Sequence, residues 1–316
     1  LYSLELLVNG EKFHEFRASV LSFTEDRYIN LLVDYERLEK TGQRIQKCFV
    51  EPSNKLSVYS PSVNNGYINI EDKKSYNLEI IAKDFNGNSQ KITIPVIGKN
   101  ETILVRKTET VTPYKINCSQ FNQFSKDGIT VAFPKNTFYN DLWLDFDVSE
   151  SIAQVHEPTV PIHNNYTITF DVSKYSDIEK QQLYIASINK KGRTNYESTV
   201  KKDSTFYTST KRLGKFTLLY DRDAPTIQLH NFKDNQWIRN HEKMQVKIFD
   251  YKSGINTYRA EINGEWILME YDVATGLLTY DFNDKIFTDS KHELKVVVTD
   301  NVGNSNTIKA TFFRKI

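Results

Sequence analysis

The sequence contains one segment twice, and the second copy is longer at its front. Residues 1–11 (Leu-Tyr-Ser-Leu-Glu-Leu-Leu-Val-Asn-Gly-Glu) align without a gap with residues 255–265 (Ile-Asn-Thr-Tyr-Arg-Ala-Glu-Ile-Asn-Gly-Glu). Further on, residues 84–89 (Asp-Phe-Asn-Gly-Asn-Ser) return as residues 300–305 (Asp-Asn-Val-Gly-Asn-Ser). Strand-like residues 221–254 precede the aligned part of the second copy, and the first copy has no counterpart to them. We therefore expect the first copy to be an incomplete domain that needs strands from sequence ahead of it.

The chain of 316 residues is rich in side chains that favour β-strands. It has 18 Tyr and 19 Phe, and aromatic and β-branched residues are enriched in strands. Short apolar or alternating runs recur along nearly the whole chain with turn residues between them, which is typical of β-sandwiches. We expect strands at residues 4–8, 78–82, 92–96, 102–105, 129–133, 142–148, 166–170, 183–187, 216–220, 226–229, 244–249, 258–262 and 294–299.

Two Asn-Gly pairs, Asn9-Gly10 and Asn263-Gly264, lie between runs of alternating apolar residues. A two-residue type I′ turn needs φ > 0 at both central positions, and Asn-Gly tolerates this conformation best. Each pair therefore predicts a tight β-hairpin.

The repeated Asp-x-x-Gly-Asn-Ser motif predicts a second hairpin in each copy. Asp84 and Asp300 can cap the turn with their carboxylates, while Gly87 and Gly303 can take the left-handed position that ends the loop. The alternative is that these Asp residues bind calcium. Calcium takes six or more oxygen ligands, and no second acidic cluster is evident in the sequence.

One stretch has helical spacing. Residues 27–40 place apolar side chains from Ile29 to Leu38 on one face, and Gly42 can end the helix. The stretch lies in an insertion at about residues 24–59, where the first copy is longer than the second. Large insertions are usually surface elaborations that make contacts, so the insertion is the predicted docking surface.

The fold class predicted is all-β, with tandem immunoglobulin-like β-sandwich domains, a β-rich middle domain and one short helical insertion. The polar link at residues 98–101 and the Asp-Arg-Asp-Ala-Pro link at residues 221–225 set the boundaries. The predicted domains are an immunoglobulin-like domain at 1–98 that lacks its N-terminal strands, a middle β-sandwich at 99–220, and a bacterial immunoglobulin-like domain at 221–316.

Charge and cysteine content exclude several classes of protein. The chain has 41 basic and 40 acidic residues, which gives no electrostatic basis for binding nucleic acid. No apolar run approaches the roughly 20 residues of a membrane helix. Cys48 and Cys118 are too few for a disulfide scaffold. They are either two free thiols or an interdomain disulfide in an oxidising compartment.

The sequence offers no catalytic, cofactor-binding or metal-binding residue. The six histidines form no His-x-His or His-Glu-x-x-His motif. His230 and Asp234 stand four residues apart, but one imidazole and one carboxylate cannot hold zinc. No nucleophile elbow or phosphate-binding loop is present, and the carboxylates are too scattered for a glycosidase pair to be assigned.

The three tryptophans, Trp143, Trp237 and Trp266, have two interpretations. They can belong to the cores of the sandwiches, or they can form a platform on which a sugar stacks. Trp143 alternates with Leu142 and Leu144 and is the first candidate for an outward-facing ring.

Several segments together resemble a known family. They are residues 1–8 with the following Asn-Gly, and residues 22–30 (Ser-Phe-Thr-Glu-Asp-Arg-Tyr-Ile-Asn), 34–36, 44–49, 54–58, 64–66 and 83–89. This string is similar to the region after the catalytic domain in lysostaphin-like (LytM-type) zinc peptidases of Bacteroidetes-group bacteria. The likeness is closest over residues 1–98. Residues 128–134 (Gly-Ile-Thr-Val-Ala-Phe-Pro) resemble a ZU5-type β domain.

In that family an early His-x-x-x-Asp and a later His-x-His hold the zinc, both in the domain upstream of the resembling region. The present sequence has no His-x-His, so no metal or catalytic residue carries over and zinc is expected only in an upstream domain. The resemblance implies an exported protein of the periplasm, outer membrane or cell surface, with relatives that cut peptidoglycan cross-links.

The expected function is that of a non-catalytic scaffold. It would dock an envelope partner, such as an outer-membrane complex, or position an upstream peptidase domain. The alternative is a peptidoglycan- or glycan-binding module that serves a peptidoglycan endopeptidase, and this rests on the aromatic residues. A third hypothesis, an autonomous enzyme, has no motif in its favour.

Overall fold

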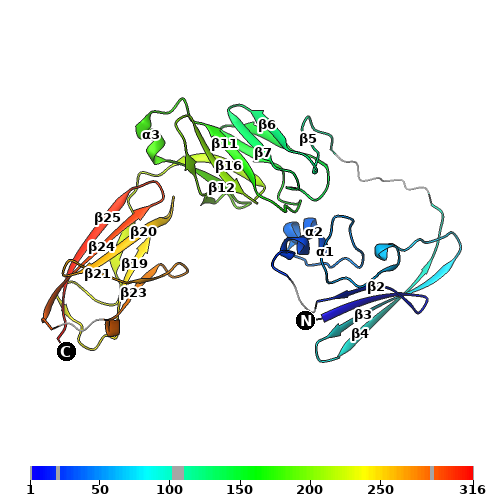
Figure 1. Cartoon of the computed structure of the whole chain (residues 1–316), viewed down its shortest axis with the longest axis horizontal. Helices are drawn as coiled ribbons and strands as arrows, with labels where there is room; N and C mark the ends of the chain where they lie inside the picture. Colours follow the sequence, from blue (N-terminus) through cyan, green and yellow to red (C-terminus); the bar gives the residue numbers. More distant parts are fainter. Residues whose placement is uncertain (1, 19–21, 102–109, 285–287, 316) are drawn as a thin grey trace.

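A computed structural model describes residues 2–18, 22–101, 110–284 and 288–315. The chain folds into three β-rich regions, and the middle one stands between the other two (Figure 1). The predicted all-β class is confirmed. The strand expected at residues 102–105 lies outside the described residues. No helix within the described ranges has the length and hydropathy of a membrane span.

The first region contains one antiparallel sheet with the strand order β2-β1-β3-β4. Tight turns join β1 to β2 and β3 to β4, and Asn9 and Gly10 have φ values of 53° and 85°, as the predicted type I′ turn requires. The strands are β1 (Tyr2–Val8), β2 (Glu11–Arg17), β3 (Ser75–Asp84) and β4 (Ser89–Ile97).

The two faces of this sheet differ in chemistry. One face carries ion pairs between neighbouring strands, including Lys83–Glu5 and Lys91–Glu79, each at 2.9 Å. The other face is apolar. In register on this apolar face, Leu78 lies opposite Ile94 and Ile80 lies opposite Ile92. Such a face is stable only when something packs on it.

The insertion covers part of the apolar face. Its side chains Leu32, Leu56 and Val58 form a small core with Phe16 of β2, and Leu4 of β1 packs against this core. Its elements are short: η1 (Asp26–Tyr28), α1 (Ile29–Leu32) and α2 (Tyr35–Thr41). A further short helix, η2 (Val63–Gly66), follows the insertion.

The single helix expected at residues 27–40 is wrong. Val33 is extended, with φ −107° and ψ 159°, and it pairs with Gln46 in an isolated β-bridge. Asp34 then caps a new helix, because its carboxylate accepts a hydrogen bond from the Arg37 N–H at 3.1 Å. Gly42 ends that helix with φ 74°, as the sequence predicted.

The middle region is a sandwich of two five-stranded sheets, ordered β13-β12-β16-β10-β9 and β14-β15-β11-β7-β6, with a small β5-β8 pair beside them. Both five-stranded sheets contribute to one core. Its elements are β5 (Lys115–Ile116), β6 (Asn122–Lys126), β7 (Ile129–Phe133), β8 (Leu142–Trp143), β9 (Phe146–Ser149), β10 (Ile152–Val155), β11 (Tyr166–Asp171), α3 (Asp177–Gln182), β12 (Leu183–Ile188), β13 (Thr194–Tyr196), β14 (Val200–Lys201), β15 (Thr205–Thr210) and β16 (Gly214–Tyr220).

The strand expected at residues 142–148 is divided between two sheets. β8 pairs with β5, whereas β9 joins the five-stranded sheet beside β10. Leu144, between them, is fully buried.

The last region is a complete sandwich with sheets ordered β17-β19-β23-β22 and β18-β25-β24-β20-β21. Asn263 and Gly264 have φ values of 54° and 82°, which confirms the second type I′ turn. The elements are β17 (Thr226–Leu229), β18 (Gln236–Trp237), β19 (Lys243–Phe249), β20 (Ile255–Ile262), β21 (Glu265–Ile267), β22 (Glu270–Asp272), β23 (Leu277–Asp281), η3 (Phe282–Asp284), β24 (Lys291–Asp300) and β25 (Ser305–Phe313).

The internal repeat holds in three dimensions. Strands β2, β1, β3 and β4 correspond to β21, β20, β24 and β25, in the same sheet order. The registers also agree, because Leu294 pairs with Ala310 just as Leu78 pairs with Ile94.

Candidate functional site

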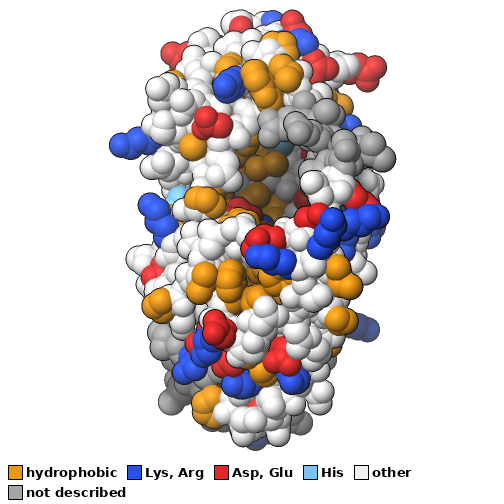
Figure 2. Space-filling view, turned by 90° about the vertical axis from the view of Figure 1, so that its right-hand side faces the viewer, with side chains coloured by type: hydrophobic (Ala, Val, Ile, Leu, Met, Phe, Trp, Pro, Cys, Tyr) orange, Lys and Arg blue, Asp and Glu red, His pale blue; other side chains and the backbone are white. Residues whose placement is uncertain are grey.

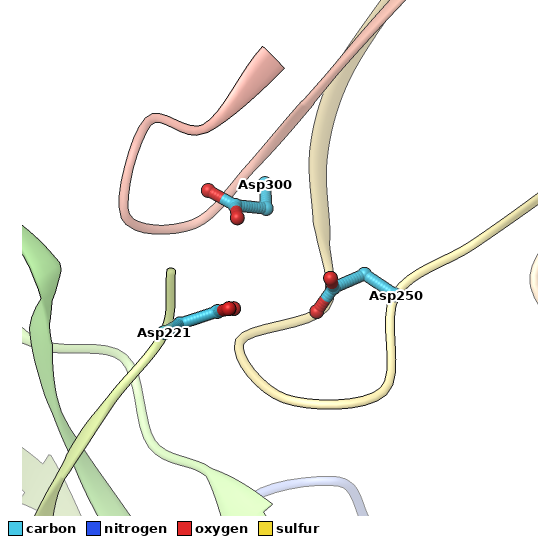
Figure 3. Close-up of side chains that lie close together, drawn as sticks. All are labelled: Asp221, Asp250 and Asp300. Atoms are coloured by element: carbon cyan, nitrogen blue, oxygen red, sulfur yellow. The ribbon is translucent and has the colours of Figure 1, made fainter. Parts of the chain in front are cut away.

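Three aspartates meet where the middle region joins the last one. Asp221 directly follows β16, Asp250 follows β19, and Asp300 ends β24. Their carboxylate oxygens lie within 4.8 Å of one another (Figure 3). Asp221 and Asp300 are completely buried and Asp250 is half-buried. The expectation that no acidic cluster accompanies Asp300 is therefore wrong.

Backbone N–H groups hold each carboxylate in place. Asp300 Oδ1 accepts from the N–H groups of Val302, Gly303 and Asn304 at 2.7–2.9 Å, which confirms the predicted turn cap. Asp221 Oδ2 accepts from the Ser253 N–H at 3.0 Å. These bonds tie the link between the regions to two loops of the last domain.

Asp250 is held in its own loop and is the least satisfied of the three. Its Oδ1 accepts from the N–H groups of Lys252 at 3.0 Å and Gly254 at 2.7 Å. Burial raises the pKa of the Asp250 carboxyl, and the nearby charges of Asp221 and Asp300 raise it further. Within the described residues, no Lys or Arg forms an ion pair with any of the three carboxylates; the neighbouring Lys252 pairs with Asp223 at 2.7 Å.

Three carboxylates this close repel one another unless they share a proton or a cation. An oxygen-only donor set suits a hard divalent cation such as calcium, which takes about six to eight oxygens. The cluster supplies three carboxylates, and five of their six oxygens already accept hydrogen bonds from the chain. Asp250 Oδ2 is the sixth oxygen, and the raised pKa of this carboxyl favours its neutral form more than that of an ordinary aspartate.

A second site joins the insertion to the middle region. The Tyr28 ring lies 4.9 Å from the His163 ring, and the Tyr139 hydroxyl donates to the Arg27 carbonyl at 2.7 Å. The Ser53 hydroxyl lies 2.8 Å from the Tyr139 carbonyl. Much of the predicted docking surface therefore contacts the chain itself.

A cleft of about 1020 Å³ lies beside this contact and has walls from both regions. Lys190 crosses it, because its Nζ donates to the Glu39 carbonyl of α2. The lining mixes charges, with Glu39, Asp145 and Glu157 against Lys190, Lys211 and Arg212. Figure 2 views the molecule from the side of the first region, and it shows a hollow with hydrophobic side chains between the upper and lower lobes.

The tryptophans do not form a common platform. Trp143 is half-buried beneath the Lys115 ammonium group, which lies 5.4 Å from the ring centroid. Trp237 and Trp266 are 60% and 58% exposed and lie on β18 and β21, at opposite edges of one sheet. The core interpretation is therefore wrong for these two. Trp237 stacks on Phe313 with 5.3 Å between ring centroids.

The remaining candidates do not come together. Asp234 accepts from the Thr311 N–H at 2.7 Å and so serves β25, while His230 is exposed. Cys48 and Cys118 are free thiols. Burial raises the pKa of both thiols, and the Asp141 carboxylate also raises that of Cys118.

The middle region is similar to a described family. The sequence model of the Zu5-like domain matches residues 113–221. The matched segment ends at Asp221, the first aspartate of the cluster. No curated protein is similar enough in sequence to match the chain.

Several solved structures show a distant likeness. The fibronectin(III)-like modules of CbhA from Clostridium thermocellum are 13% identical, with a TM-score of 0.25, over 63% of this chain and 87% of theirs. The glucan-utilization protein SGBP-B of Bacteroides ovatus, solved with a mixed-linkage heptasaccharide, is 9% identical, with a TM-score of 0.20, over 99% of this chain and 60% of its own. The endo-β-1,4-mannanase of Thermotoga petrophila is 14% identical, with a TM-score of 0.25, over 30% of this chain and 20% of that enzyme. TM-scores this low do not indicate a shared overall fold.

Proposed function

We propose that this chain is a non-catalytic array of β-domains that acts as a scaffold in an exported cell-envelope protein. The observation that carries the proposal is the two-sided packing of the insertion. One side closes the core with Phe16 of the first sheet, and the other side places Tyr28 against His163 of the middle region. Domains joined only by a linker would not make contacts on both sides of one insertion. We call this two-sided contact the brace.

The scaffold has a second brace at its other junction. Asp221 Oδ2 accepts from the Ser253 N–H of the last domain at 3.0 Å, and the Asp221 N–H donates to the Gln182 carbonyl of the middle region at 2.8 Å. Arg222 Nε also donates to Gln182 Oε1 at 2.9 Å. Both terminal regions are thus tied to the middle one by side-chain contacts as well as by the chain. Rigid placement of domains is what a positioning or docking role requires.

The finer proposal is that the scaffold belongs to a lysostaphin-like peptidase-related protein of the periplasm or outer membrane. There it positions an upstream peptidase domain or docks an envelope complex. The resemblance of residues 1–98 supports this proposal.

The brace can be tested by measuring the distance between spin labels on the first and middle regions. Replacing Tyr28→Ala and Tyr139→Ala together removes the ring contact and the bond to Arg27, so the distance distribution should broaden. Phe23→Ala is the matched control, because Phe23 is 98% exposed and should leave the distribution narrow. An unchanged distribution in the double variant contradicts the scaffold proposal.

Glycan binding remains a second candidate because of one observation, the exposed stack of Trp237 on Phe313. Contiguous exposed apolar patches can mark ligand-binding sites. If the stack binds sugar, the chain is retained on purified peptidoglycan, and Trp237→Ala abolishes the retention while Trp143→Ala preserves it. Equal retention of both variants excludes the stack as the sugar site.

A further inference from the structure

Half of the apolar face of the first sheet is open. Ile92 and Ile94 of β4 are 61% and 42% exposed, and Leu78 and Ile80 of β3, opposite them, are only half-buried. The insertion reaches β1 and β2 but not this half. A contiguous apolar face of this kind marks an interaction surface.

The last domain shows what covers the same half in the complete copy. Its Leu294 and Val296 correspond to Leu78 and Ile80, and they are completely buried. They share one core with Val246 and Ile248 of β19 and with Ile227 of β17. Because β17 also contacts β25 and β19 is the neighbour of β17 in its sheet, these two strands lie over β25 and β24.

The other half is covered differently in the two copies. In the last domain Tyr271 of β22 lies over Tyr258 of β20, with ring centroids 5.6 Å apart. In the first region Leu4, which aligns with Tyr258, packs against the core that the insertion makes. The insertion therefore occupies the place of β22 and β23, and the place of β17 and β19 is open.

We propose that the open half of the first sheet is the binding face for a strand pair of the β17–β19 type, joined to the chain ahead of β1. The order of the strands selects this source, because β17 and β19 precede β20 in sequence and lie over the half that is open in the first copy. A strand pair bound there would fix the position of any domain attached to it relative to the first sheet. The surface is separate from the contact between the insertion and the middle region.

The chemistry of the occupant follows from β19. Its side chains alternate, with Met244, Val246 and Ile248 buried and Lys243 and Lys247 exposed. A strand with this alternation presents one apolar face to Ile92 and Ile94 and a polar face to water. A strand with apolar side chains on both faces would create a new exposed patch.

The experiment uses the chain's own strands as the probe. Residues 221–254 are fused ahead of Leu1, which restores the spacing of the last domain because Leu1 aligns with Ile255. Hydrogen exchange of residues 89–97 is then compared between the chain and the fusion. We expect exchange to slow by about tenfold or more, since buried strands open far less often than exposed ones. A matched fusion carrying Val246→Asp and Ile248→Asp in the added segment should give no slowing.

A second measurement tests whether the fused segment 221–254 packs on the open face itself. Ile94→Asp should leave the stability of the unfused chain nearly unchanged and should abolish the slowing in the fusion. Thr93→Asp, on the polar face, should preserve the slowing. Equal exchange in the two fusions overturns the proposal. A dimer of the unfused chain that Ile94→Asp dissociates also overturns it, because a second copy would then be the occupant.

Discussion

The sheet of the first region and the larger sheet of the last domain align strand for strand, yet their apolar faces meet different surroundings. In the last domain Leu294, Val296 and Phe312 are completely buried, whereas the equivalent Leu78, Ile80 and Val96 are only half-buried. The hairpins and registers are the same in both. Local sequence therefore specifies the sheet, and its partner layer decides how much stability each residue contributes.

The repeated aspartates, Asp84 and Asp300, also differ in their surroundings although they cap equivalent turns. Asp84 caps its turn in the open, accepting from the Asn88 N–H and side-chain amide. Asp300 caps the equivalent turn but lies buried beside Asp221 and Asp250. These two come from segments that precede the aligned part of the repeat in the last domain.

The largest difference is expected at a matched pair of leucines. Leu294→Ala should destabilise the last domain by about 2–5 kcal/mol, because it leaves a cavity in a closed core. Leu78→Ala should cost the first region only about 1 kcal/mol, because less apolar area leaves contact. Calorimetry of each variant, with the transitions of the domains resolved, measures both values. Equal losses would mean that the first sheet is covered as fully as the last.

The next difference concerns the two capping aspartates. Asp300→Ala removes the buried acceptor of three part-buried N–H groups and should cost about 1–3 kcal/mol. Asp84→Ala exposes its N–H groups to water and should have a clearly smaller effect. The midpoints of thermal unfolding rank the two variants, and a reversed order would contradict the burial difference.

A pH dependence of stability is expected at the carboxylate cluster of the last domain. Burial and the neighbouring carboxylates hold the folded pKa of Asp250 above its unfolded value. The associated stability is therefore fully present below the unfolded pKa, and it is lost as pH rises through the folded one. Asp250→Asn should remove this loss, so the variant gains on the wild type as pH increases above about 4.

The measurement is thermal unfolding across that pH range, with a chelator in the buffer. If the wild type instead gains on Asp250→Asn when calcium replaces the chelator, the cluster holds a cation in place of the proton. A difference between the two proteins that does not vary with pH would show that Asp250 keeps an ordinary pKa.

The smallest effect is expected at the brace of the first region. Burial lowers the pKa of His163, and the charges of Lys211, Lys55 and Arg27 lower it further. Its contact with Tyr28 is therefore favoured in the neutral form and weakens as pH falls below about 6.5. The spin-label distance should broaden slightly at about pH 5, and His163→Gln should suppress the change. Broadening of the same size in the variant would assign the effect to another group.

Much of the fold was predictable because its signals are local. The Asn-Gly pairs, the repeated Asp-x-x-Gly turn and the alternating runs each specify a hairpin or a strand within a few residues. The prediction of one helix at 27–40 was wrong because the spacing of apolar residues does not reveal a break in a helix. The Asp34 cap starts a second helix after Val33. The strand at 142–148 failed because pairing with β5 and with β10 divides it.

The site was less predictable because its residues come from distant segments. Asp221 and Asp300 are 79 positions apart in the sequence, and Asp250 belongs to a third loop. A local signal was present in the link at 221–225, which contains two aspartates close together before a proline. Exposure of Trp237 and Trp266 depends on which sheet edge each strand occupies, and this is set by long-range pairing.

The most direct test of the account is thiol labelling at one aligned pair of positions, in a chain carrying Cys48→Ser and Cys118→Ser. Ile94→Cys and Ala310→Cys occupy equivalent places on the two sheets, 42% and 3% exposed in the present residues. At low protein concentration, we predict that the thiol at 94 reacts at nearly the rate of a free thiol, while the thiol at 310 reacts only when the last domain opens. Equal protection of both thiols in a monomer would contradict the claim that the first sheet is open.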